Sequence, residues 1–195
     1  MKQEFTITIY TENQVGLLNR IAIILTRRKI NIESLNTSPS EYPDIFRFTI
    51  VIEETEEVVR KVVAQFEKQV EVLKAYYHTN DQIVWREMAM YKVPTKEVAE
   101  KVVVERLLSA YGARAVAIRA DYIVFEVTGH REETSKLLEV LEPYGLIEFV
   151  RSARIAIIKG SHDFHERLRE FEEAEPGESA STNTYLGQQA EVFSM

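Results

Sequence analysis

The residues whose types are best suited to bind a ligand lie in segment 10–25. In this segment a strand pattern passes into an apolar helix through Glu-Asn-Gln-Val-Gly. The first turn of a helix has unpaired backbone N–H groups and a partial positive charge, which suit a carboxylate. Gly16 has no side chain to block a ligand, and Asn13 offers a carbonyl acceptor and an amide donor. These groups can hold the carboxylate and the ammonium of a free amino acid. The apolar walls would come from Val15, Leu17 and Leu18.

A plain turn explains the same residues on chemistry alone. Such turns are common, and both Asn13 and Gly16 suit their backbone geometry. Asn31, at the start of the next expected strand, is likewise more typical of a turn or a strand edge than of a ligand contact. The residues therefore leave a ligand site and a simple connection both open.

Catalytic and metal-binding patterns are missing from the sequence. It has no cysteine, which excludes disulfides and thiolate chemistry, and its seven glycines form no nucleotide-binding or nucleophile motif. His162 and His165 lie three apart but beside an expected disordered segment, and no histidine has a carboxylate at the spacing of a metal-binding helix. The carboxylates mostly accompany Lys or Arg on expected helix faces. We therefore predict no catalytic residue, no metal site, and a binding module rather than an enzyme.

The charge of the chain is concentrated in its last segment. Residues 161–195 contain eight acidic residues and two arginines, whereas residues 1–160 hold 23 acidic and 22 basic residues. The near-neutral main part argues against a nucleic-acid partner. No stretch approaches the roughly 20 apolar residues of a membrane span, and the start lacks a signal-peptide pattern. These features predict a cytoplasmic protein with no membrane contact.

The hydrophobic periodicity of the first 77 residues predicts the order βαββαβ. Strands are expected where apolar residues alternate, and helices where they recur every three or four positions. The expected strands are 4–10, 30–37, 45–54 and 70–77, and the expected helices are 15–29 and 55–69. This order is typical of a ferredoxin-like module, a four-stranded antiparallel sheet backed by two helices.

The same order recurs after a connection over residues 78–84. Expected strands are 85–93, 113–120, 122–129 and 147–158, and expected helices are 96–111 and 131–145. The sequence VEVLKA at 70–75 also matches IEFVRS at 147–152, an offset of 77 residues. Convergence of two similar modules would give the same pattern, but we favour duplication of the fold.

We therefore predict an α+β chain with two tandem ferredoxin-like modules. Their boundaries are 1–78 and 79–160, followed by a flexible acidic tail over 161–195. The tail is expected to aid solubility, with a docking peptide as the alternative. The unpaired sheet edges of the first module predict a homodimer, because pairing two chains would cover them.

Three spaced blocks resemble the regulatory (small) subunit of acetohydroxyacid synthase, also called acetolactate synthase. The first, NQVGLLNRIAIILTRRKINIESLNTSPSE at 13–41, is similar to the N-terminal signature of that family. WREMAMYKV at 85–93 and LLEVLEPYGLIEFVRSARIAIIKG at 137–160 resemble its later blocks. The resemblance covers residues 3–160, with Leu17 and Ala153 in place of the smaller residues usual in the family.

The resemblance implies that the first module is an ACT domain, which pairs with a second copy and binds an amino acid in the interface. By position, Asn13, Val15, Gly16, Leu17 and Leu18 would contact the effector from one chain. Asn31 and Ile32 would contact it from the partner. The effector would be a branched-chain amino acid, usually valine, acting by feedback inhibition in valine, leucine and isoleucine biosynthesis.

The implied partner is the catalytic subunit, which the small subunit activates. That subunit carries thiamine diphosphate, magnesium and FAD, and none of these is expected to bind the present chain. One alternative is a stand-alone amino-acid-sensing ACT protein that regulates another enzyme.

Two further alternatives come from other functional classes. A small enzyme would use carboxylates of the second module. An RNA-binding sheet would need exposed aromatic residues on its strands. The candidates for that role are Phe46, Phe48, Tyr122 and Phe125.

Overall fold

The computed structural model describes residues 1–100 and 102–160. The predicted acidic tail, together with His162 and His165, lies outside the described residues. Within the described part, no helix is long and apolar enough to cross a membrane.

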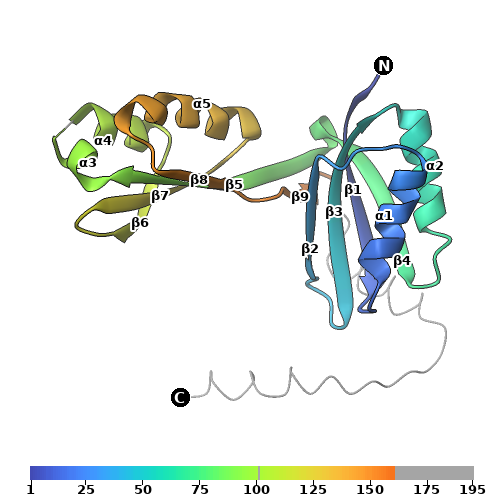
Figure 1. Cartoon of the computed structure of the whole chain (residues 1–195). Coiled ribbons are helices and arrows are strands. Elements are labelled where there is room, and N and C mark those ends of the chain that lie inside the picture. Colours follow the sequence, from blue (N-terminus) through green and yellow to red (C-terminus); the bar gives the residue numbers. More distant parts are fainter. Residues whose placement is uncertain (101, 161–195) are drawn as a thin grey trace, which may run out of the picture. The chain divides into compact units, whose positions relative to one another are not determined.

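The first module is a four-stranded antiparallel sheet with two helices on one face (Figure 1). Its elements are β1 (Gln3–Glu12), α1 (Leu17–Arg27), β2 (Ser34–Pro39), β3 (Ile45–Glu54), α2 (Glu56–Phe66) and β4 (Val72–Thr79). The strand order β2-β3-β1-β4 is that of a ferredoxin-like module. The predicted fold of this part is confirmed.

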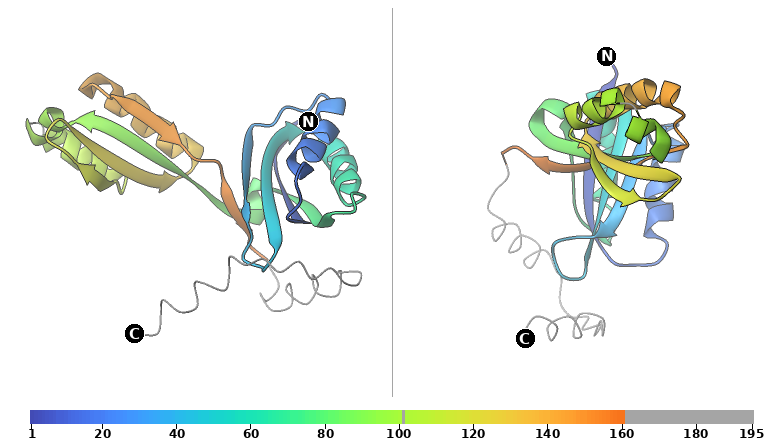
Figure 2. Two further views of the ribbon diagram at one scale, coloured as in Figure 1. Left: turned by 60° about the horizontal axis from the view of Figure 1, so that its bottom comes forward. Right: turned by 90° about the vertical axis from the view of Figure 1, so that its left-hand side faces the viewer.

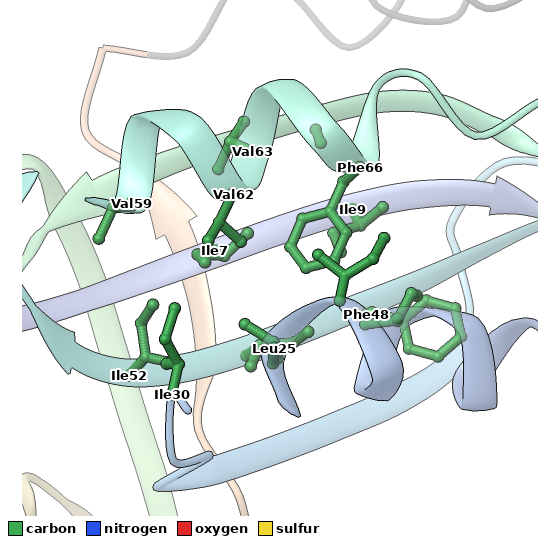
Figure 3. Close-up of a cluster of buried hydrophobic side chains, with 14 of the residues drawn as sticks. Ile7, Ile9, Leu25, Ile30, Phe48, Ile52, Val59, Val62, Val63 and Phe66 are labelled. Atoms are coloured by element: carbon green, nitrogen blue, oxygen red, sulfur yellow. The ribbon is translucent and has the colours of Figure 1, made fainter. Parts of the chain in front are cut away.

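The core of this module forms where the strand and helix periodicities meet. Alternate residues of β1 face the helices, and the helices present apolar residues at spacings of three and four (Figure 3). The buried residues labelled there include Ile7, Ile9, Leu25, Phe48, Val59, Val62 and Phe66. Burial of these side chains supplies the main favourable free energy for folding the module.

The second module repeats the arrangement. Its elements are η1 (Asn80–Gln82), β5 (Ile83–Pro94), α3 (Thr95–Glu100), α4 (Val102–Ala110), β6 (Arg114–Ile118), β7 (Tyr122–Gly129), α5 (Arg131–Leu141), η2 (Glu142–Tyr144), β8 (Glu148–Arg151) and β9 (Ile155–Ile158). The order β6-β7-β5-β8 matches that of the first sheet, and helices again cover one face (Figure 2). Two ferredoxin-like sheets are therefore present, as predicted.

The last predicted strand, 147–158, is wrong as a single element. It forms two strands, β8 and β9, which pair with different parts of β5. The interruption contains Arg154, whose side chain is buried and hydrogen-bonded to Glu4 and Thr6 of β1. Residues 152–154 lie outside both strands, and apolar residues resume directly after them, so the periodicity gave no sign that Arg154 reaches another sheet.

Other element boundaries shift by a few residues. The first helix begins at Leu17 instead of residue 15, because Gly16 has a left-handed conformation with φ of +88°. β2 begins at Ser34 instead of residue 30, after Lys29 adopts φ of +56°. The helix predicted over 96–111 is present as α3 and α4. The predicted boundary between residues 78 and 79 falls just before the end of β4, and the division into domains stays a prediction.

Candidate functional site

A hollow of about 180 Å³ lies where β1 passes into α1. Its walls come from the loop after β1, the first turn of α1, and strands β2 and β3. The lining residues are Thr11, Glu12, Asn13, Gln14, Gly16, Leu17, Leu18, Thr37, Phe46 and Phe48. Four of the predicted effector residues, Asn13, Gly16, Leu17 and Leu18, are thus brought to one cavity.

Gly16 gives this hollow an open helix start. It is the N-cap of α1, and in the described structure no side chain caps the first turn by a hydrogen bond. The Gly16 carbonyl accepts from the backbone N–H of Arg20 at 3.2 Å, while the N–H groups of the first turn have no acceptor within the helix. A Cβ built on Gly16 would meet no atom within 4 Å. The space beside the helix start is therefore accessible to an anionic group.

The loop before Gly16 is held in place from both sides. The Nε2 of Gln14 donates to Oε2 of Glu12 at 2.7 Å, and the N–H of Glu12 donates to the carbonyl of Glu71 at 3.0 Å. Arg20 of α1 pairs with the Glu71 carboxylate. A hydrogen bond from the backbone N–H of Glu71 and the bond from Arg20 keep the pKa of Glu71 below its ordinary value. These contacts position Asn13, which is exposed, at the mouth of the hollow.

Three predicted residues do not line the hollow of this chain. Val15 is fully exposed. Asn31 is exposed and donates from Nδ2 to Oε1 of Glu33 at 2.9 Å, and Ile32 is half-buried against the first core. The resemblance places Asn31 and Ile32 in a partner chain, and that role stays a prediction.

Thr11 is the most informative lining residue that the sequence reasoning missed. Its side chain is fully buried, and within the described residues its hydroxyl has no hydrogen-bond partner. It continues the series Phe5, Ile7, Ile9 along the core face of β1 and lies opposite Phe46 of β3. A polar residue in an otherwise apolar series could have marked Thr11 as a candidate site residue from the sequence. Thr37, Phe46 and Phe48 were missed because strand pairing alone brings them to the hollow.

The aromatic residues considered for RNA binding do not form an exposed surface. Phe48 and Phe125 are buried in the two cores, and Phe46 packs against the first. Tyr122 is half-buried beneath Lys92, whose Nζ lies 4.4 Å from the ring centroid. Three of the four candidates are therefore packed in or against a core, whereas RNA recognition uses exposed aromatic rings.

The carboxylates of the second module are the candidates for the alternative of a small enzyme. Across residues 1–100 and 102–160, no group of three or more His, Asp or Glu side chains could hold a metal ion. Glu87 of the second module is buried, and its Oε2 lies 3.8 Å from Nε of Arg151. Glu87 thus faces the Arg151 cation. A second hollow, of about 220 Å³, lies on the second sheet and is lined in part by Lys92, Tyr122 and Glu148, but none of the predicted effector residues lines it.

Both halves of the chain match family models. A model described as the AHAS small subunit-like ACT domain matches residues 7–74. A model described as the small subunit of acetolactate synthase matches residues 86–160.

Curated relatives extend the match over most of the chain. The acetolactate synthase small subunit of Bacillus subtilis is 35% identical over 162 residues, covering 83% of this chain and 92% of that protein. A probable acetolactate synthase small subunit of Archaeoglobus fulgidus is 33% identical over 156 residues, covering 80% and 97%. The crystal structure of the Thermotoga maritima small subunit has a TM-score of 0.73 at 23% identity, covering 82% of this chain and 99% of that one. The chain belongs to the family of acetolactate synthase small subunits.

Proposed function

We propose that this chain is a non-catalytic regulatory subunit that activates the catalytic subunit of acetolactate synthase. It also confers feedback inhibition by a branched-chain amino acid, with valine as the first candidate. The observation that carries the proposal is the hollow at the uncapped start of α1, which unites four effector residues expected from the resemblance.

The binding chemistry follows from the groups around the hollow. The first-turn N–H groups donate to the carboxylate of the ligand, and the Asn13 side-chain carbonyl accepts from its ammonium. Leu18 and Phe46 offer apolar contact to the side chain of the ligand. Leu17 is buried in the first core, so much of its bulk packs away from the ligand. The hollow of about 180 Å³ has room for a compact aliphatic amino acid.

Catalysis belongs to the partner in this proposal. The catalytic subunit holds thiamine diphosphate, magnesium and FAD, and the present chain contributes only binding surfaces. The alternative of a stand-alone sensor for another enzyme is distinguished by a pull-down from native lysate with an acetolactate assay. Acetolactate production that responds to valine supports the proposal, and capture of a different valine-responsive enzyme favours the alternative.

Changing Gly16 to Asp is expected to abolish valine binding and feedback inhibition while leaving activation of the catalytic subunit. The new carboxylate would occupy the anion position at the helix start. Isothermal titration with L-valine and acetolactate assays of the holoenzyme measure the two effects.

Gly112→Asp is the matched control for this change. Gly112 also has a positive φ, +64°, and also has no atom within 4 Å of a built Cβ. It is absent from the lining of the hollow. Gly112→Asp should therefore cause the same kind of backbone strain as Gly16→Asp but retain feedback inhibition by valine. Feedback that survives Gly16→Asp would show that the pocket is misplaced.

The chain is expected to be a homodimer in solution. Strands β2 and β4 end the first sheet within the described residues, and their outer edges have hydrogen-bonding groups available for a second copy. Light scattering should give twice the chain mass of 22.6 kDa. A measured mass of one chain at micromolar concentration would contradict the homodimer. It would also contradict the prediction that Asn31 and Ile32 of a second chain complete the site.

A further inference from the structure

The buried hydroxyl of Thr11 is energetically unfavourable in the ligand-free chain. Thr11 is fully buried, and its Oγ1 makes no hydrogen bond within the described residues. Leaving a buried polar group without a partner costs free energy, whereas valine has nearly the same shape and would avoid that cost. The apolar residues before it on the same face, Phe5, Ile7 and Ile9, show that the strand tolerates hydrophobic side chains there.

The position of Thr11 connects this hydroxyl to the hollow. Thr11 lines the cavity together with Asn13 and Gly16. Rotation about χ1 by 120° moves the hydroxyl to the position that the methyl group or the hydrogen on Cβ held before, and threonine populates more than one such rotamer. The hydroxyl can therefore turn toward a ligand that lies between β1 and the first turn of α1.

We propose that Thr11 is a further effector-binding residue whose hydroxyl donates a hydrogen bond to the carboxylate of the bound amino acid. This inference rests on the proposed function, because it uses the same hollow. It adds a contact from the floor of the cavity to those from the helix start and from Asn13. The geometry also explains why a polar side chain stands at the end of an apolar strand face.

The test compares Thr11→Val with Thr11→Ser in the full chain, with the catalytic subunit present, by titration with L-valine. Thr11→Val keeps the shape but removes the hydroxyl, so it is expected to weaken valine binding about tenfold, the effect of one hydrogen bond to a charged group. Thr11→Ser keeps the hydroxyl and should remain within about threefold of the wild type. If Thr11→Val does not fold, Thr11→Ala provides a second variant without the hydroxyl.

The thermal midpoint of the free chain is the second measurement. Without a ligand, Thr11→Val should unfold at the same temperature as the wild type or higher, because it removes an unpaired buried hydroxyl. A purely structural hydroxyl would instead make Thr11→Val less stable than Thr11→Ser. Opposite effects on stability and on affinity are therefore the signature of a binding role.

Three results would overturn the inference, and they separate it from the proposed function. Unchanged valine affinity in Thr11→Val, with a wild type that binds, overturns only the role of Thr11. A ligand-free Thr11→Val variant that is less stable than Thr11→Ser also overturns only the role of Thr11. A wild-type holoenzyme that binds no valine overturns the effector assignment itself, and the role of Thr11 with it.

Discussion

Replacement of Arg154 by methionine is expected to lower the free energy of unfolding by about 3 kcal/mol, the low end of the cost of breaking a buried ion pair. The Arg154 side chain is only 2% exposed, while that of its partner Glu4 is 31% exposed and can regain water. Methionine keeps much of the volume but removes the charge and the donors. Urea unfolding followed by circular dichroism measures the loss.

The contacts of Arg154 explain the size of this effect. Its Nη2 donates to Oε1 of Glu4 at 2.7 Å, and its Nη1 donates to Oγ1 of Thr6 at 2.9 Å and to Oδ1 of Asn80 at 3.1 Å. The guanidinium also lies 3.6 Å from the ring centroid of Trp85. These groups come from β1 and from the adjoining elements η1 and β5, so one side chain joins two regions that are distant from it in sequence.

Arg114→Met is the control for Arg154→Met. Arg114 pairs with Glu126 in the second sheet, but its side chain is 75% exposed. An exposed pair contributes little because water competes for both charges, so the expected loss is below about 1 kcal/mol. Equal losses in the two variants would contradict the role assigned to the buried arginine.

The effect of Arg154→Met should also depend on pH. Burial alone would raise the pKa of Glu4, but hydrogen bonds from Asn80 and Arg154 and the Arg154 charge hold it below its ordinary value of 4.5. A carboxyl group with a lowered pKa in the folded state stabilises the protein above its unfolded pKa, and loses that contribution as the pH falls through the folded pKa. The stability difference between wild type and Arg154→Met should therefore be largest above pH 4.5 and shrink in more acidic solution.

Truncation of Phe66 to alanine is the second large effect, with an expected loss of about 3–5 kcal/mol in unfolding free energy. Phe66 is fully buried at the end of α2 and belongs to the first core (Figure 3). Alanine would remove the ring from contact with its neighbours and leave a cavity. The same urea titration measures this loss, and an unchanged m-value would show that the folded state stays compact.

Val70→Ala tests whether the loss comes from the core. Val70 lies four residues after Phe66, but the residue is 92% exposed. Its truncation should change stability by no more than about 0.5 kcal/mol. A loss below about 1 kcal/mol for Phe66→Ala would contradict the packing described for α2.

The predicted part of the site is the part that is continuous in sequence. Asn13, Gly16, Leu17 and Leu18 fall within one turn and the start of one helix, so their proximity follows from local geometry. The other walls come from β2 and β3, and their approach depends on the pairing of β1 with β3. Residue types alone do not specify which distant strand supplies Phe46.

The sequence by itself determined the two βαββαβ modules, because strand and helix periodicities are properties of neighbouring residues. It also placed the connection between β1 and α1 to within two residues. Only the tertiary structure showed that the Thr11 hydroxyl has no hydrogen-bond partner among the described residues and that Arg154 is buried against Glu4. Both depend on which side chains surround a residue after folding, and the partners of Arg154 in β1 are about 150 positions away. Burial and hydrogen bonding between distant segments are fixed by packing, which periodicity does not encode.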